Sequence, residues 1–141
     1  MVPNEFFKKQ IGQLSPGKLL FPAEGEGRNA VYAAGLGWEV SAFDISEEGR
    51  RKALKLARIH QVAIDYRMSD WQNVSYPEEA FDALAFIFVH LPSAQRYLFH
   101  EKMQKYLKPG GILIMEAFSK NHLVYNQVNE KAGGPRAVDL L

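Results

Sequence analysis

The feature that most constrains the fold is a repeated alternation between short apolar runs and segments with a helical pattern. The apolar runs cover residues 18–22, 38–43, 61–68, 81–89 and 112–118. Helical patterns lie over residues 4–13, 28–36, 46–58 and 93–107. Strands that alternate with helices are joined by right-handed crossovers into a parallel sheet. The sequence therefore predicts an α/β fold with a doubly wound, mainly parallel sheet.

Local signals set the expected ends of these segments. Ser46 can cap the third helix, and the acidic residues 47–48 in its first turn complement the helix dipole. Residues 69–78 are expected to form a loop, and residues 108–111 (KPGG) a sharp turn before the fifth strand. Residues 119–141 are polar and are expected to be loop-like, which leaves the fifth strand at or near a bare sheet edge.

Composition narrows the class of protein. A chain of 141 residues with 47% hydrophobic residues fits one domain, residues 1–141. The formal net charge of +1 argues against a nucleic-acid binder, and the absence of cysteine excludes thiolate catalysis and Cys-based zinc sites. The longest apolar run, residues 83–89, is too short for a membrane helix, which needs about 18 residues or more. We therefore expect a cytoplasmic protein.

Polar or aromatic residues follow four of the predicted strands. Residues 25–27 (GEG) follow the first strand, Asp44 the second, Asp70 and Trp71 the third, and His90 the fourth. Ligands of open α/β sheets bind at the carboxyl ends of the strands. Glycines allow close backbone approach, a carboxylate can accept hydrogen bonds from ribose hydroxyls, and an aromatic ring can cover a base. The pattern therefore indicates a nucleoside-containing ligand.

Each of these features also has a structural explanation. The glycines could serve a turn, Asp44 could be a helix cap, and Asp70 with Trp71 could pack a loop; their joint position at successive strand ends favours a ligand site. Residues 25–30 formally fit the G-x-G-x-x-A pattern of dinucleotide sites. Carboxylates of Glu24 and Glu26 would repel a pyrophosphate and favour a positively charged ligand such as S-adenosylmethionine, although Arg28 partly offsets them.

Residues 19–46 (LLFPAEGEGRNAVYAAGLGWEVSAFDIS) resemble the first two motifs of class I S-adenosylmethionine-dependent methyltransferases. Residues 27–29 (GRN), 108–111 (KPGG) and 133–135 (GGP) resemble the tellurite-resistance methyltransferase-like branch. The resemblance extends over about residues 18–118, and it implies a Rossmann-like methyltransferase fold with S-adenosylmethionine as cofactor.

The resemblance also implies roles for single residues. Residues near the methionine part of the cofactor would be Ala23, Glu24, Gly25, Gly27 and Asn29, with backbone near Phe88 holding the cofactor's amino group. Residues near the adenosine part would be Asp44 on the ribose hydroxyls and Ile45, Ser69, Asp70 and Trp71 around the adenine. Arg28, His90 and Tyr125 would face the substrate, with His90 as the candidate general base.

Three departures from the family pattern stand out. Phe21 replaces the usual acidic residue, and Ala23 replaces a glycine, so Glu24 is the nearest carboxylate to the methionine end. The family fold normally continues beyond the fifth strand into a helix and a final strand pair, so the chain is interpreted as C-terminally truncated and lacking the usual last strands. A homodimer formed through the incomplete sheet edge is one consequence.

The first functional hypothesis is methyl transfer from S-adenosylmethionine to a small-molecule acceptor such as a thiol, selenium or tellurium species. The alternatives are a nonenzymatic S-adenosylmethionine-binding or assembly module and, with less support, an NAD-dependent oxidoreductase. The four histidines show no metal-ligand spacing, so no metal site is predicted.

Overall fold

The computed structural model describes residues 2–87, 89, 91–116 and, for the backbone alone, 122–126. Its elements in chain order are α1 (Glu5–Ile11), β1 (Lys18–Pro22), α2 (Arg28–Gly35), β2 (Glu39–Asp44), α3 (Glu47–Ile59), β3 (Asp65–Met68), β4 (Phe81–Ile87), α4 (Ser93–Gln104), β5 (Leu107–Glu116) and β6 (His122–Asn126). None of the described helices is long and apolar enough to cross a membrane.

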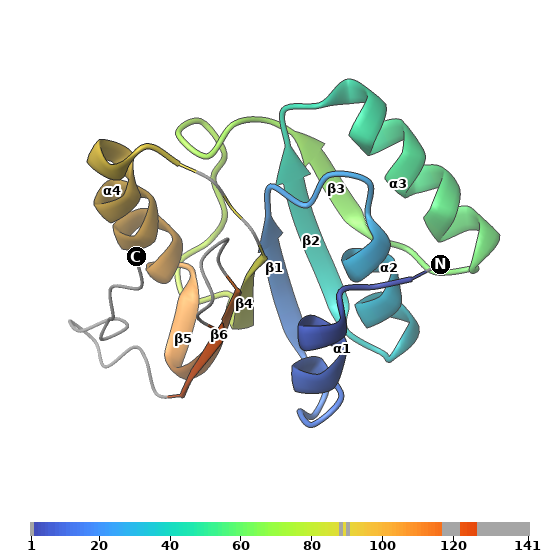
Figure 1. Cartoon of the computed structure of the whole chain (residues 1–141), viewed down its shortest axis with the longest axis horizontal. Helices are drawn as coiled ribbons and strands as arrows, with labels where there is room; N and C mark the ends of the chain where they lie inside the picture. The colour runs from blue at the N-terminus through green and yellow to red at the C-terminus, as the bar shows by residue number, and fades with distance from the viewer. Residues whose placement is uncertain (1, 88, 90, 117–121, 127–141) are drawn as a thin grey trace.

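The described strands form one sheet in the order β3-β2-β1-β4-β5-β6 (Figure 1). Strands β1 to β5 are parallel, whereas β6 runs antiparallel to β5. The predicted doubly wound, mainly parallel sheet is thus confirmed. The order reverses between β1 and β4, and such a switch point opens a crevice for ligands at the carboxyl ends of the strands.

Two apolar layers cover the two faces of the sheet. Along β1, Leu19 and Phe21 point to a core shared with α1, α2 and α3, whereas Leu20 points to a core shared with α4 and the segment before β4. Figure 1 shows α1, α2 and α3 on one side and α4 on the other. Burial on both faces explains why the inner strands β1 and β4 read as nearly continuous apolar runs, whereas β2 alternates and β3, at the edge, carries exposed polar residues.

The third strand is shorter than predicted. The apolar pattern predicted a strand over residues 61–68, but β3 begins at Asp65. Gln61 lies in the left-handed region with φ of 59°, and the N–H of Val62 donates to the Ala57 carbonyl. This geometry is a Schellman cap, which ordinarily uses glycine, so the glutamine concealed that residues 61–62 still belong to the cap of α3 and not to β3.

The turn predicted at residues 108–111 belongs to β5 instead. Phe81 pairs with Leu107 and Ala83 pairs with Ile112, so residues 108–111 bulge out of register within the strand. Gly110 has φ of 82°, which a residue with a side chain rarely adopts. The glycines thus serve an irregularity inside a strand rather than a turn before it.

Part of the tail predicted to be loop forms a strand. Strand β6 pairs along β5, from Ile112 opposite Asn126 to Glu116 opposite His122. The expectation that β5 is a bare edge is therefore wrong, because β6 covers it. The apolar run in this strand, residues 123–125, has only three residues, which is too short to identify a strand from the sequence alone.

Candidate functional site

The carboxyl ends of the parallel strands bring the predicted ligand residues to one edge of the sheet. Strand β1 ends at Pro22 and is followed by residues 23–27, here called the glycine loop. Strand β2 ends at Asp44, and β3, which ends at Met68, is followed by Ser69. Asp44 and Met68 are register partners, so the ends of β2 and β3 lie side by side. The predicted convergence of these segments is confirmed.

Small residues let α3 approach the glycine loop closely. Gly27 has φ of 88°, and a Cβ atom placed on it would lie 2.5 Å from the Cβ of Ala53 in α3. A Cβ atom on Gly49 would lie 3.0 Å from the Gly25 carbonyl oxygen. Glycine is needed at these positions because the backbones of α3 and the loop touch here and leave no room for a side chain.

The carboxylate of Asp44 anchors the glycine loop. Its Oδ2 accepts a hydrogen bond from the Gly25 N–H at 2.9 Å, and its Oδ1 accepts one from the Ser46 N–H at 3.2 Å. The Ser46 hydroxyl in turn caps α3 by accepting from the Gly49 N–H at 2.9 Å. A carboxylate has about four lone-pair sites, so two bonds leave acceptor capacity for ligand hydroxyls.

Glu24 caps the start of α2. Its Oε2 accepts a hydrogen bond from the Ala30 N–H at 2.8 Å, and the N-cap residue Gly27 has no side chain for this task. Burial raises the pKa of Glu24 to about 8, and the negative charge of the nearby Asp44 also raises this pKa. The hydrogen bonds from Ala30 and Asn29 act in the opposite direction but are smaller in effect. At neutral pH this carboxyl group is therefore largely protonated.

The charges around the loop differ from the sequence-based expectation. Glu26 forms ion pairs with Arg28 at 3.5 Å and with Lys52 of α3 at 3.3 Å. Glu24 is largely protonated and Glu26 is paired with two cations. These two residues therefore repel a pyrophosphate less strongly than the sequence suggested. That electrostatic argument is corrected, and the choice of ligand must rest on other observations.

The remaining loop residues have defined places. Ala23 is exposed and has φ of 53°, a left-handed conformation at the position where the family pattern has glycine. The Asn29 Oδ1 accepts from the Asn4 N–H at 2.7 Å, which links α2 to the start of α1. Arg28 is exposed and points its guanidinium to Glu26.

Tyr66 is a site residue that the sequence did not single out. Its hydroxyl donates to the Gly25 carbonyl, so the Gly25 backbone is held by Asp44 through its N–H and by Tyr66 through its oxygen. Burial, followed by the carboxylates of Asp44 and Glu24, raises the pKa of Tyr66 and keeps the phenol protonated. The sequence indicated only that Tyr66 lies in a strand. Its hydrogen-bond partner is 41 residues away in the chain, so no local pattern could predict the contact.

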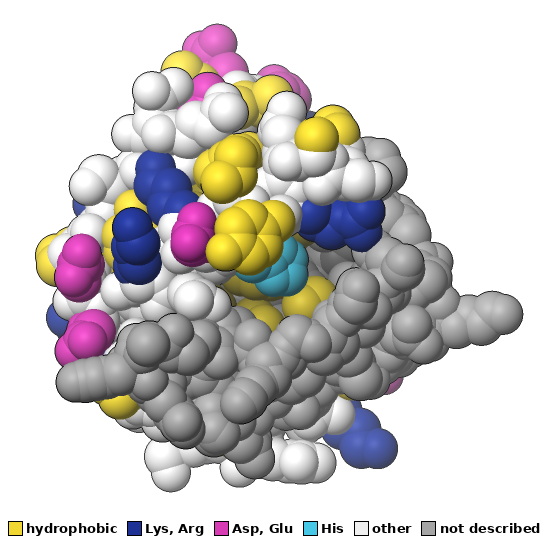
Figure 2. All heavy atoms as spheres, turned by 90° about the vertical axis from the view of Figure 1, so that its left-hand side faces the viewer, with side chains coloured by type: hydrophobic (Ala, Val, Ile, Leu, Met, Phe, Trp, Pro, Cys, Tyr) yellow, Lys and Arg dark blue, Asp and Glu magenta, His cyan; other side chains and the backbone are white. Residues whose placement is uncertain are grey.

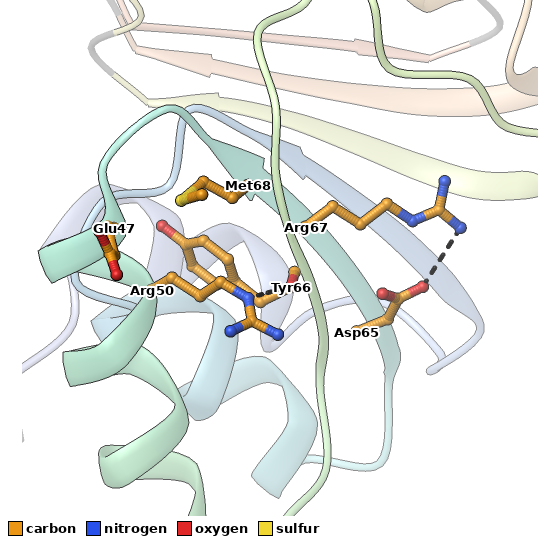
Figure 3. Close-up of a pocket in the computed structure, with 6 residues that line it drawn as sticks. All are labelled: Glu47, Arg50, Asp65, Tyr66, Arg67 and Met68. Carbon is orange, nitrogen blue, oxygen red and sulfur yellow. Dashed lines mark hydrogen bonds and ion pairs between the residues drawn. The ribbon is translucent and has the colours of Figure 1, made fainter.

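A cleft of about 470 Å³ lies beside Tyr66, between α3 and the outer edge of β3. In Figure 3, Arg50 extends from α3 toward Tyr66, whereas Arg67 and Asp65 pair on the other side of the strand. The Arg50 Nε donates to the Tyr66 carbonyl at 2.9 Å. None of the residues lining this cleft belongs to the glycine loop, so we do not assign the ligand site to it.

Exposed apolar side chains flank Asp44. Ile45 is 71% exposed and Met68 is 55% exposed, although both are large hydrophobic residues. Ser69 follows Met68, and its N–H donates to the Asp44 carbonyl at 3.0 Å. Two large apolar side chains therefore remain open to solvent beside Asp44.

Asp70 and Trp71 belong to a single turn after Ser69. The Asp70 Oδ1 accepts from the Asn73 N–H at 2.8 Å, so its carboxylate caps this turn. The Trp71 ring packs edge-on against Phe99 of α4, with ring centroids 5.7 Å apart. Both side chains therefore have structural contacts within or next to this turn, Asp70 with Asn73 and Trp71 with Phe99.

Some predicted residues lie outside the described part of the chain. Phe88 and His90 follow β4, and neither belongs to the described residues. Tyr125 lies in β6, of which the backbone alone is described. Glu116, at the carboxyl end of β5, is only 7% exposed and is a buried carboxyl group at this edge that the sequence did not single out.

The chain is similar to solved structures of the same fold. A protein from Pyrococcus horikoshii OT3 is 27% identical with a TM-score of 0.72, covering 79% of this chain and 51% of that one. TehB from Haemophilus influenzae is 20% identical with a TM-score of 0.72, over 79% and 40% of the two chains. A SAM-dependent methyltransferase from Methanosarcina mazei is 19% identical with a TM-score of 0.69, over 81% and 57%.

This chain therefore spans about half the length of these structural relatives. No curated protein matches it in sequence. The model of a methyltransferase-domain family matches residues 22–115, which run from the end of β1 to the end of β5 and include the whole glycine loop and Asp44. The chain belongs to this methyltransferase-domain family, which implies S-adenosylmethionine as its cofactor.

Proposed function

We propose that this chain binds S-adenosylmethionine at the carboxyl edge of the sheet and transfers its methyl group to a small-molecule acceptor. The observation that carries the proposal is the bond between the Asp44 carboxylate and the Gly25 N–H at 2.9 Å, which joins the two predicted binding segments into one site. Family membership supports the same cofactor.

The residues present fit this cofactor. A Cβ atom added to Gly25 would meet nothing within 4 Å, so the loop leaves open space above its backbone. Ala23, Glu24, Gly25, Gly27 and Asn29 would hold the methionine part, together with backbone near Phe88. A bound ammonium or sulfonium would lower the pKa of Glu24 and favour its ionised form, with the proton released to solvent, because an adjacent cation favours the charged form of a carboxyl group.

The adenosine part would lie across the ends of β2 and β3. Asp44 would accept hydrogen bonds from the ribose hydroxyls with its remaining lone pairs. Ile45 would pack on the adenine, and Ser69, Asp70 and Trp71 would border it. The exposure of Ile45 supports this assignment, because a ligand ring would cover apolar surface that otherwise faces water.

When bound, the cofactor supplies an electrophilic methyl group on a sulfonium that leaves as a neutral thioether. The chain's own task is to hold the acceptor in line with that methyl group and to exclude water. Arg28, His90 and Tyr125 are the proposed substrate-side residues, and His90 would accept the proton of an oxygen or nitrogen nucleophile. A thiol, selenium or tellurium acceptor would need little help from a base.

The acceptor branch and the assembly remain predictions. The motifs at residues 27–29 and 108–111, together with the fold likeness to TehB, favour a tellurium- or selenium-containing acceptor. A homodimer would form through the free edge of β6, since β6 rather than β5 ends the sheet. Sedimentation velocity would show a dimer, and a monomer at all concentrations would contradict it.

The binding test is calorimetric titration with S-adenosylmethionine, S-adenosylhomocysteine and NAD. We expect wild-type protein to bind the first two and Asp44→Asn to bind them at least tenfold more weakly. Asp82→Asn is the matched control, because Asp82 also accepts a backbone N–H, from Lys18 at 2.8 Å, but near the start of β1. Equal affinities of the two variants would contradict the assigned role of Asp44.

Activity requires a second measurement. Conversion of S-adenosylmethionine to S-adenosylhomocysteine in the presence of thiols, selenite or tellurite would show transfer and identify the acceptor class. Binding without conversion of any acceptor would favour the nonenzymatic cofactor-binding module. Preference for NAD would favour the oxidoreductase and would overturn the proposal.

A further inference from the structure

The turn that carries Asp70 and Trp71 is held by one side chain from the opposite helix. The Lys102 ammonium in α4 donates to the carbonyl oxygens of Trp71 at 2.9 Å, Gln72 at 3.0 Å and Val74 at 2.7 Å. An ammonium has three N–H donors, so all three are used. Among the described residues, no carboxylate forms an ion pair with Lys102. Its ammonium is therefore bound there by the three carbonyl oxygens.

The geometry of the turn explains why a cation suits this place. The N–H of Val74 donates to the Asp70 carbonyl at 3.1 Å, which closes one helical turn. The Asp70 carboxylate caps the start of that turn, and Lys102 caps the carbonyls at its end. A negative group at the start and a positive group at the end both complement the dipole of the turn.

Further contacts hold the same segment against α4. Trp71 packs edge-on against Phe99, and the Val74 side chain is buried with the core on this face of the sheet. Figure 2 shows the face that carries α4, where hydrophobic side chains gather around a histidine and border a hollow. The turn is thus attached to α4, while Arg67 of β3 holds the residue that follows it by donating to the Ser75 carbonyl at 2.8 Å.

We infer that Lys102 is a positioning residue for the adenine side of the cofactor site. The inference rests on the proposed adenosine site: Lys102 touches no proposed ligand atom, but it fixes the backbone that presents Asp70 and Trp71. Without this ammonium, the carbonyls of Trp71 and Gln72 lose their donor, that of Val74 keeps only the Tyr106 hydroxyl at 3.5 Å, and the turn samples other conformations. Apparent affinity falls in proportion to the fraction of molecules in the binding-competent state.

The test compares Lys102→Met, Lys102→Arg and the control Lys105→Met, whose lysine is exposed and lies at the end of the same helix. All variants carry Trp38→Phe, which leaves Trp71 as the sole tryptophan. The Nε1 of Trp38 has no hydrogen-bond partner among the described residues, so this change removes no hydrogen bond recorded there. The measurements are Trp71 emission without ligand, the urea midpoint, and affinity for S-adenosylhomocysteine.

For Lys102→Met we expect Trp71 emission at longer wavelength and an affinity for S-adenosylhomocysteine about tenfold lower. Such a loss corresponds to a turn that has its binding-competent conformation in about a tenth of the molecules. Lys102→Arg retains charge and donors and should restore both, and Lys105→Met should match the parent. Emission and affinity equal to those of Lys105→Met would overturn the inference. A change in only one of them would also overturn it, because the argument links the two through the turn.

Failure of the proposed function is distinguishable from failure of this inference. If the parent protein binds no S-adenosylhomocysteine, the cofactor proposal fails whatever Lys102 does. If the parent and Lys102→Met bind it equally, the cofactor site stands and the positioning role is wrong.

Discussion

Replacing Gly27 by alanine tests whether the glycine loop depends on direct backbone contact with α3. The new Cβ would lie 2.5 Å from the Ala53 Cβ and 2.8 Å from the Ala53 Cα, at a residue whose φ is 88°. A left-handed L-residue costs about 1–2 kcal/mol, and overpacking adds about 1–3 kcal/mol. The lower entropy of the unfolded chain returns about 0.4–1 kcal/mol. The expected loss of unfolding free energy is about 3 kcal/mol.

Two further variants separate strain from overlap. Gly35→Ala lies at the other end of the same helix, where a Cβ atom meets nothing within 4 Å, and it should stabilise the protein by up to about 1 kcal/mol. Ala53→Gly alone should cost about 1 kcal/mol of helix propensity. Combined with Gly27→Ala, it removes the overlap with the Ala53 Cβ but leaves the 2.8 Å contact with the Ala53 Cα and the left-handed strain.

Urea unfolding of the four variants measures the coupling between Gly27 and Ala53. With a slope of about 2 kcal/mol per molar urea, Gly27→Ala should lower the midpoint by about 1.5 M. The double variant should be more stable than the sum of its single changes by about 1–3 kcal/mol. Additive effects, or a Gly27→Ala protein as stable as Gly35→Ala, would refute the close-contact explanation.

Three further outcomes follow from the same site. In the folded protein the pKa of Glu24 is about 8, above the ordinary glutamate value of 4.5. The stability contributed by its protonated form is therefore complete below pH 4.5 and is lost as the pH rises to about 8. The stability of wild type relative to Glu24→Gln should therefore fall across that window in urea titrations, by at most about 1.4 kcal/mol per pH unit, and a constant difference would contradict this. Tyr66→Phe removes the donor to the Gly25 carbonyl and should lower stability by about 0.5–1.5 kcal/mol and weaken S-adenosylhomocysteine binding several-fold by calorimetry; unchanged binding would argue against the loop anchor. Ala23→Gly relieves a left-handed φ of 53° and should raise the unfolding free energy by about 0.5 kcal/mol despite the added chain entropy, so a clear loss of thermal stability would be unexpected.

The inner strands could be predicted from the sequence because burial on both faces leaves a strong local record. Strand β1 was predicted with its observed bounds, and the cap at Ser46 placed the start of α3 correctly. The end of α3 was predicted to within one residue, but the start of β3 was placed four residues too early, because Gln61 adopts a backbone conformation that glycine usually signals. Strand β6 was missed because it forms by pairing with β5, and the composition of residues 122–126 alone does not indicate a strand.

The sequence by itself determined the α/β class, and it led to the proposal of a site at the carboxyl edge with Asp44 and the glycine loop at its centre. These follow from periodicity and from residues that stand directly after apolar runs, both of which are local properties. Only the tertiary structure decided that Tyr66 holds Gly25, that Gly27 lies against Ala53, and that Lys102 caps the turn after β3. Such partners lie 26 or more residues apart, and the packing of helices on the sheet brings them together, so no local pattern encodes them.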